Sequence, residues 1–249
     1  MSYKVTTNLI APNKFSRPQR PLNKIKGIVI HYLANPNTSA NQNRNYFDNL
    51  KSQKLDGNER YASAHEIIDL DGNIVICVPD NEITFNCGSK TYTNRCLKEL
   101  GKHPNDYTYG IECCHIDDNG NMTKDTYNSL FNRCVELCIK YKLNSNNLWL
   151  HKEVVGWKSC HKFFVLNPDK WVRFKKDVQT EINIIKKGVA KLDYKQIIQM
   201  CTDSPDKWLK AIDTIVQMAK DKGDLGDLEI FQFLPTLIEK IYCKGIDLK

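Results

Sequence analysis

The chain has 249 residues, of which 41% are hydrophobic and 26% charged, as in an ordinary globular protein with one substantial core. The formal net charge of +7 favours an anionic partner, such as nucleic acid or an anionic cell wall. No stretch of Lys and Arg interleaved with aromatic residues supports nucleic acid. The ten cysteines lack the spacing of a small disulfide scaffold, and no apolar stretch is long enough to span a membrane.

The first sixty residues predict an irregular arm, a strand and a helix. Prolines at 12, 18 and 21 interrupt residues 1–24, so we expect an arm without regular elements there. Residues 24–33 are apolar and rich in β-branched side chains, the pattern of a strand buried on both faces. From residue 40 to 50, Tyr46, Phe47 and Leu50 recur at helical spacing.

The middle of the chain predicts a hairpin, a further strand and a long helix. Residues 61–78 indicate two strands joined by the turn Asp71-Gly72. The polar stretch 79–106 predicts no regular element, and 107–116 predicts another strand that carries Glu112. Thr123 is a suitable N-cap for a helix with one apolar stripe that ends near Tyr141.

The remaining sequence predicts a strand over 147–150 and a helix that begins at Asn167-Pro168. A linker follows, and then a small helical module over 193–249 that exposes several lysines. The predicted fold class is therefore α/β. It comprises a first domain over 1–187, with a mixed central sheet flanked by helices, and an all-α module at the C-terminus.

Three residues form a candidate metal site. His151 closes an apolar strand and Cys160 follows nine residues later, so an imidazole and a thiolate lie at the two ends of one loop. Both groups are ligands that Zn²⁺ accepts, and a third ligand must come from elsewhere. His31 is the best donor because it lies at the end of the strand Ile28–Ile30. A histidine or cysteine alone is more often an ordinary core residue, whereas this combination predicts an open zinc site.

Two charged residues accompany these ligands. Lys158 is either a solvated surface lysine or a cation placed to stabilise a developing oxyanion beside the metal. Glu112 lies within an apolar strand, where a carboxylate needs either an ion-pair partner or a polar cleft. The residues alone leave both alternatives open.

Four segments together resemble a known family. They are Gly-Ile-Val-Ile-His at 27–31, Tyr-Ala-Ser-Ala-His-Glu-Ile-Ile-Asp-Leu-Asp-Gly at 61–72, Tyr-Gly-Ile-Glu at 109–112, and His-x6-Lys-x-Cys at 151–160. In order and spacing they are similar to the zinc-dependent N-acetylmuramoyl-L-alanine amidases of the amidase-2 type, which include phage endolysins and autolysins. The likeness covers roughly residues 20–180. Two departures are His161, where many relatives have proline, and Asn86-Cys87-Gly88, which replaces a Trp-His-Ala-Gly-like segment.

The resemblance implies hydrolysis of the amide between N-acetylmuramic acid and L-alanine in peptidoglycan. It implies zinc held by His31, His151 and Cys160, with Glu112 as general base. Strand alternation turns His65 with Ile67 to one side, so His65 either contacts the substrate, takes part in catalysis, or is a sheet residue that touches the substrate groove or the core.

The sequence is also compatible with rival functions. A non-catalytic peptidoglycan-binding module is the main rival, and the complete ligand set with Cys160 argues against it. The N-terminus lacks a charged segment followed by an apolar core, so we expect synthesis in the cytoplasm without a signal peptide. That favours an endolysin, acting on the wall after release, over an exported bacterial autolysin. The module at 193–249 would bind anionic wall polymers or join two chains.

Overall fold

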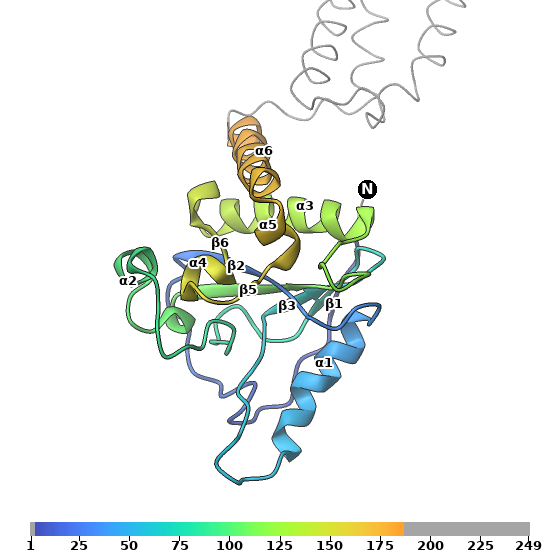
Figure 1. Ribbon diagram of the computed structural model, residues 1–249, viewed down its shortest axis with the longest axis vertical. Helices are drawn as coiled ribbons and strands as arrows, with labels where there is room; N and C mark the ends of the chain where they lie inside the picture. Colours follow the sequence, from blue (N-terminus) through green and yellow to red (C-terminus); the bar gives the residue numbers. More distant parts are fainter. Residues whose placement is uncertain (1–2, 187–249) are drawn as a thin grey trace, which may run out of the picture. The chain divides into compact units, whose positions relative to one another are not determined.

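The computed structural model describes residues 3–186, which form a six-stranded sheet with helices on both faces (Figure 1). The strands are β1 (Val5–Thr7), β2 (Gly27–Tyr32), β3 (Glu66–Ile68), β4 (Ile74–Ile76), β5 (Thr108–Cys113) and β6 (Leu148–Leu150). The α-helices are α1 (Ala40–Asn49), α2 (Asn94–Glu99), α3 (Lys124–Lys140), α4 (His151–Val155), α5 (Lys162–Leu166) and α6 (Pro168–Lys186). The expected α/β class is confirmed, whereas the module expected over 193–249 lies outside the described residues.

The strand order is β1-β4-β3-β5-β2-β6, and every pairing is parallel except β3 with β4. The antiparallel pair is the expected hairpin, and Gly72 in its turn has a φ of +80°, which glycine adopts without strain. Because β5, β2 and β6 are adjacent and parallel, their C-terminal ends meet at one edge of the sheet. Loops that follow parallel strands converge at such an edge, where ligands commonly bind.

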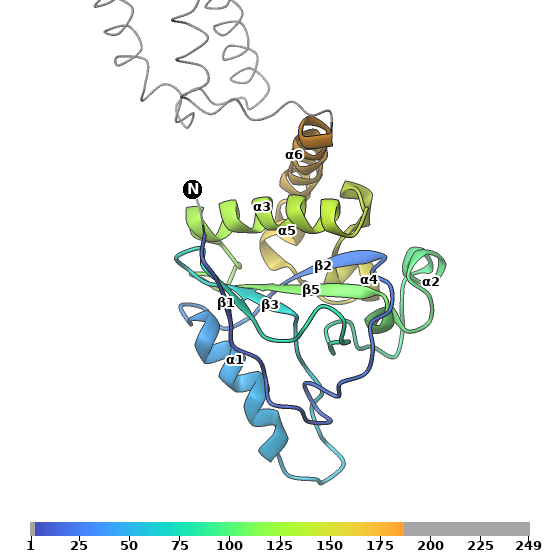
Figure 2. The same ribbon diagram turned by 180° about the vertical axis from the view of Figure 1, so that it is seen from behind.

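The two faces of the sheet carry different layers. Helices α3, α5 and α6 cover one face and α1 lies on the other, as Figure 2 shows from behind. Alternate residues of β2 divide between the faces: Ile28 and Ile30 join the core beneath α3, whereas Val29 packs on the opposite side with Trp149. As expected, α6 buries Trp171, Phe174 and Val178. Complete burial of side chains of this kind contributes about 1.5–3 kcal/mol each.

Several short elements differ from the prediction. The arm contains β1, which pairs in parallel with β4. The stretch 79–106 contains α2, whose N-cap Thr93 accepts a hydrogen bond from the Cys96 amide. His151 begins α4 rather than closing a strand. Elements of three to six residues bury too few side chains to show a clear periodicity, so their tertiary partners decide them.

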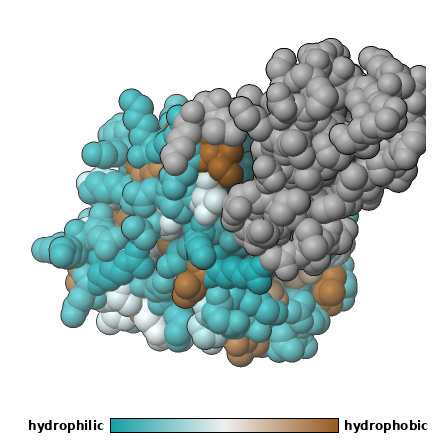
Figure 3. All heavy atoms as spheres, turned by 90° about the horizontal axis from the view of Figure 1, so that it is seen from above, coloured by the Kyte–Doolittle hydropathy of each residue, from teal (hydrophilic) through white to brown (hydrophobic). Residues whose placement is uncertain are grey.

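The face shown in Figure 3 is mostly hydrophilic, with hydrophobic residues in separate small groups. No helix within residues 3–186 combines the length and the apolar character that crossing a bilayer requires.

Candidate metal centre

His31 and Glu112 lie side by side at the shared edge of the sheet. They are register partners on the parallel strands β2 and β5. Side chains alternate along each strand, so both residues point to the face opposite α3, while their neighbours Ile30 and Ile111 fill the core beneath that helix. An imidazole and a carboxylate are thus held next to each other by two central strands.

His151 comes to the same place because β6 pairs with β2. It is the first residue of α4, directly after β6, and it is buried. The Glu153 carboxylate accepts a hydrogen bond of 2.8 Å from the Leu150 amide and so stabilises the start of this helix. The rings of His31 and His151 meet edge to face, with centroids 4.6 Å apart and an interplanar angle of 74°.

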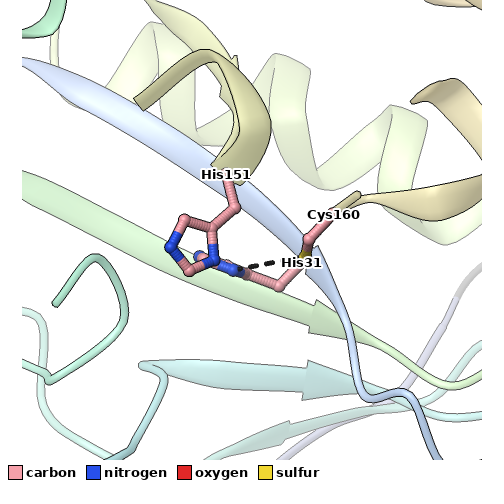
Figure 4. A group of neighbouring side chains, drawn as sticks. All are labelled: His31, His151 and Cys160. Carbon is pink, nitrogen blue, oxygen red and sulfur yellow. Dashed lines mark hydrogen bonds between the residues drawn. The ribbon is translucent and has the colours of Figure 1, made fainter. Parts of the chain in front are cut away.

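Cys160 completes the cluster from the loop that follows α4. Its carbonyl oxygen accepts a hydrogen bond of 2.7 Å from the Lys152 amide, which fixes the loop beside the start of the helix. Its Sγ lies 3.7 Å from His31 Nδ1. Figure 4 shows the side chains of His31, His151 and Cys160 pointing toward one another, and one ligand atom from each lies within 4.8 Å of the others.

The donor set fits a bound cation. Burial lowers the pKa of His31 to about 3, opposed by the nearby amide of Asn86. Burial also lowers the pKa of His151 to about 2. Both imidazoles are therefore neutral at neutral pH and can act as nitrogen ligands. In His151, Nε2 is buried and has no hydrogen-bond partner among residues 3–186. Buried polar atoms of this kind call for a partner.

The distance between the ligand atoms and the chemistry of the Cys160 thiol also fit a bound cation. Zinc binds nitrogen at about 2.0–2.1 Å and sulfur at about 2.3 Å, so tetrahedral ligand atoms lie roughly 3.3–3.7 Å apart. The separation of 3.7 Å between Sγ and Nδ1 agrees with that range. Burial raises the pKa of the Cys160 thiol, so a thiolate forms there only when a cation offsets its charge. The three residues that the sequence singled out are therefore brought together in a form suited to zinc.

Glu112 presents a carboxyl group with an altered proton affinity. Its Oε2 is buried and makes no hydrogen bond to the described residues, although the residue as a whole is partly exposed. Burial raises the pKa of Glu112 to about 8, and the charge of Lys158 opposes that shift. A carboxyl group with a pKa near neutrality is suited to exchange protons with a reacting molecule.

Lys158 extends from the loop between His151 and Cys160. Its charge contributes to lowering the pKa of His31, His151 and Glu112, which places its ammonium group near all three. The side chain is half-buried, and its Nζ lies 5.3 Å from the centre of the Trp157 ring. Lys158 is therefore a cation at the margin of the cluster.

His65 occupies a different environment from the one expected for substrate contact. Its side chain is fully buried and stacks on Tyr109, with ring centroids 4.3 Å apart. Nδ1 accepts a hydrogen bond from the Gly110 amide at 2.9 Å, and Nε2 lies 3.0 Å from the Glu82 carbonyl oxygen, to which it donates. Both nitrogens are thus satisfied inside the protein. The position just before β3 turns the ring into the core, where its contacts are structural.

Asn86 adjoins the cluster, although no role was predicted for its side chain. The side chain is buried, and its Nδ2 donates to Thr84 Oγ1 at 2.7 Å. It packs against Gly110 so closely that a Cβ there would lie 2.8 Å from Asn86 Cγ. The signal for this contact was the glycine within the apolar strand β5. A glycine inside a strand often marks a close approach by another group.

His161 also proves to be near the ligands. It is fully buried next to Cys160, and burial lowers its pKa to about 3. Neither ring nitrogen forms a hydrogen bond within the described part of the chain. Spacing alone did not distinguish this histidine from the others.

Comparison with known proteins identifies the family. The family described as N-acetylmuramoyl-L-alanine amidase, amidase-2, matches residues 21–163, which include all three ligands and Lys158. The chain belongs to the amidase-2 family. A probable N-acetylmuramoyl-L-alanine amidase of Bacillus licheniformis is 31% identical over 171 residues, covering 68% of this chain and 44% of the relative. The amidase BlyA of Bacillus subtilis strain 168 is 30% identical over 184 residues, covering 72% of this chain and 47% of the relative.

Solved structures share the fold. The structure of PlyL superposes with a TM-score of 0.53 at 20% identity, covering 72% of this chain and 98% of PlyL. A mutant endolysin from Bacillus subtilis gives 0.55 at 21% identity, covering 71% of this chain and 99% of that one. The His31–His151–Cys160 cluster is consistent with the zinc site of amidase-2 proteins. The chain spans about half the length of the curated relatives it matches.

Proposed function

We propose that this protein is a zinc-dependent N-acetylmuramoyl-L-alanine amidase. It would hydrolyse the amide that joins the lactyl group of N-acetylmuramic acid to the L-alanine of the stem peptide. One observation carries the proposal: in a chain of the amidase-2 family, His31, His151 and Cys160 converge beside a carboxylate on the adjacent strand. Bound to these residues, zinc would supply a Lewis acid and acidify a water molecule, whose pKa can fall to about 7 in such sites.

Glu112 is proposed as the proton acceptor. It lies beside His31 in the sheet register, and its buried Oε2 is free of other partners among residues 3–186. As water attacks the amide carbonyl carbon, Oε2 would take a proton from it and then deliver that proton to the leaving nitrogen of L-alanine. General acid–base catalysis of this kind contributes about 10²–10⁴ in rate.

Lys158 is proposed to stabilise the oxyanion. Negative charge develops on the carbonyl oxygen as the tetrahedral centre forms, and a fixed cation nearby lowers the energy of that state more than that of the substrate. The lowering effect of Lys158 on the pKa of both Glu112 and His31 supports this role. His31 and His151 would remain neutral throughout.

The arrangement favours an enzyme over a binding module. A module that only binds peptidoglycan needs neither three convergent metal ligands nor an adjacent carboxylate with a raised pKa. Such groups are costly to bury, so their retention together argues for chemistry.

Hydrolysis of purified cell wall tests the activity. The enzyme should release new N-terminal L-alanine amino groups without new reducing sugar ends, and Cys160→Ala should abolish that release. New reducing ends without new amino groups would reject the proposal, because they would mean cleavage of the glycan instead.

We further propose that the protein acts as an endolysin on peptidoglycan and anionic wall polymers. The net charge of +7 supports attraction to an anionic wall, and one of the proteins with the same fold is an endolysin. When the protein is produced inside bacteria, lysis should then follow only after the membrane is permeabilised. Lysis without permeabilisation would favour an exported autolysin.

A further inference from the structure

Trp157 stands out among the exposed hydrophobic side chains. Its relative exposure is 62%, and it lies in the loop that connects His151 to Cys160, directly before Lys158. A single exposed apolar residue is common on protein surfaces and needs no special role by itself. This large indole, however, lies between two proposed metal ligands along the chain.

The indole ring is held in a defined orientation. Its Nε1 donates a hydrogen bond of 3.2 Å to Ser89 Oγ, and the Ser89 amide in turn donates to the Tyr92 hydroxyl at 3.2 Å. Thr93 ties the same segment to α4, since its Oγ1 donates to the Glu153 carbonyl oxygen at 2.7 Å. The ring is thus anchored through its polar edge while its apolar surface stays open to solvent. Such pre-organisation reduces the entropy that a ligand must lose on binding.

Lys158 connects this ring to the reaction centre. Its Nζ lies 5.3 Å from the Trp157 ring centre, and it stands two residues before the ligand Cys160 in the same loop. In the proposed reaction the ammonium group faces the carbonyl oxygen of the scissile amide. That carbonyl belongs to the lactyl group of the sugar. Trp157, which precedes Lys158, would therefore lie beside the sugar half of the substrate and away from the peptide.

We propose that Trp157 is a substrate-binding residue whose indole packs against the N-acetylmuramic acid ring. This inference rests on the proposed amidase function. The C–H groups of a pyranose ring form an apolar face, and an exposed, fixed indole offers a matching surface. The contact would position the sugar, and through it the lactyl carbonyl, next to Lys158. Trp157 would therefore determine specificity for the glycan side of the bond without taking part in the chemistry.

Kinetics of the full-length Trp157→Ala variant on a soluble N-acetylmuramoyl-L-alanyl peptide tests the contact. We expect KM to rise about tenfold with kcat changed by less than about twofold, because the contact exists before and during the reaction alike. Trp157→Phe should recover part of the loss, since it restores a smaller aromatic face. Tyr46→Ala, which removes an exposed ring from α1, should leave KM unchanged.

A second substrate separates sugar contact from damage to the loop. On a lactyl-L-alanyl peptide, which has the scissile amide but no sugar, wild type and Trp157→Ala should have equal kcat/KM. An equal loss on both substrates would overturn the proposal, because it would show that Trp157 acts through Lys158 or Cys160.

Nitrogen-15 NMR supplies a readout that needs no turnover. The Trp157 indole N–H resonance, assigned from its absence in Trp157→Phe, should shift when the muramoyl peptide is added to the full-length Glu112→Gln variant. The lactyl peptide should leave it unmoved. A resonance unaffected by the muramoyl peptide would reject the contact. Absence of hydrolysis by wild type, with the resonance still shifting, would instead reject the amidase function and keep the sugar site.

Discussion

His31 and Glu112 are direct register partners on two adjacent parallel strands, β2 and β5. Their mutual position therefore depends on the backbone hydrogen bonds of the central sheet rather than on a loop. Groups carried by regular elements keep their geometry more accurately than groups on loops do. Only Cys160 and Lys158 come from a loop, and the bond from the Lys152 amide to the Cys160 carbonyl oxygen restrains it.

Removal of the ligands should remove the ion. We expect the double variant His31→Ala, Cys160→Ala to contain almost no zinc, whereas wild type contains one zinc per chain, because loss of ligands from a three-ligand site usually abolishes metal retention. Elemental analysis after gel filtration measures the ratio. Cys138→Ala, a buried cysteine in α3, provides the control and should keep its zinc. Stoichiometric zinc in the double variant would refute the ligand assignment.

Replacement of Glu112 by glutamine should separate metal binding from catalysis. The amide keeps the shape of the side chain but cannot accept the proton, so zinc content should stay at wild-type level while turnover falls by about 10²–10⁴. Release of L-alanine amino groups from purified wall measures turnover. If Glu112→Gln lyses walls as fast as wild type, Glu112 is structural and another group accepts the proton.

The pH dependence of stability should reveal the buried state of His65. Burial lowers its pKa to about 4 from an ordinary value of 6.5. The unfolded chain then binds the proton more strongly, so the contribution to stability is complete above about pH 6.5 and is lost as pH falls toward 4. For this one group the loss between pH 7.5 and 5 is about 2 kcal/mol.

Urea unfolding of wild type and His65→Gln across this pH range measures the difference. The variant should be less stable at pH 7.5, where it lacks the bonds to Gly110 and Glu82, and the gap should narrow at pH 5. Other buried histidines affect both proteins alike and cancel in the comparison. A gap that stays constant with pH would show that His65 is not held neutral by the fold.

An added methyl group at Gly110 should disturb the metal-ligand cluster through Asn86. A Cβ there would lie 2.8 Å from Asn86 Cγ, inside the normal contact distance. Overpacking of this kind costs about 1–3 kcal/mol and should displace Asn86 beside His31. We expect Gly110→Ala to lower the free energy of unfolding and to weaken zinc binding, as measured by competition with a chelator. Gly88→Ala, where the new methyl meets nothing within 4 Å, should match wild type.

Truncation after Lys187 should separate hydrolysis from attachment to the wall. The segment over 193–249 lies outside the described residues, and its lysines led us to expect contact with anionic wall polymers. The truncated protein should hydrolyse a soluble muramoyl peptide normally but lyse intact walls more slowly. That difference should shrink as salt screens the attraction. If the truncated and full-length proteins lyse walls equally fast and contain the same number of chains per particle in solution, both wall binding and dimerisation are rejected.

The long elements and the ligand set were predictable from the sequence because their signals are local. β2 begins with a run of apolar residues, and β5 is largely apolar on either side of Glu112. In α3 the apolar residues recur at helical spacing after Thr123, a suitable N-cap. The turn Asp71-Gly72 specified its hairpin in the same way. His31, His151 and Cys160 followed from the chemistry of metal ligands at strand and loop ends.

The remaining features depend on contacts between distant segments. β1 (Val5–Thr7) forms by pairing in parallel with β4. Three residues are too few to show a periodic pattern that would predict this pairing. For His65 the sequence left both a substrate groove and the core open, because alternation does not distinguish a groove from a core when both lie on the same face. The fixed orientation of the Trp157 indole depends on its hydrogen bond to Ser89, which lies 68 residues earlier in the chain.

The separation of His31 from Cys160 by 129 residues along the chain has a consequence for folding. An ion held by both residues would act as a cross-link between the second strand and the end of the domain. In the unfolded chain these ligands are far apart and form no site, so the free energy of metal binding adds to that of folding. At a free metal concentration one hundred times the Kd, this linkage contributes about 2.7 kcal/mol. A chelator should therefore lower the melting temperature and make the domain a better substrate for proteases.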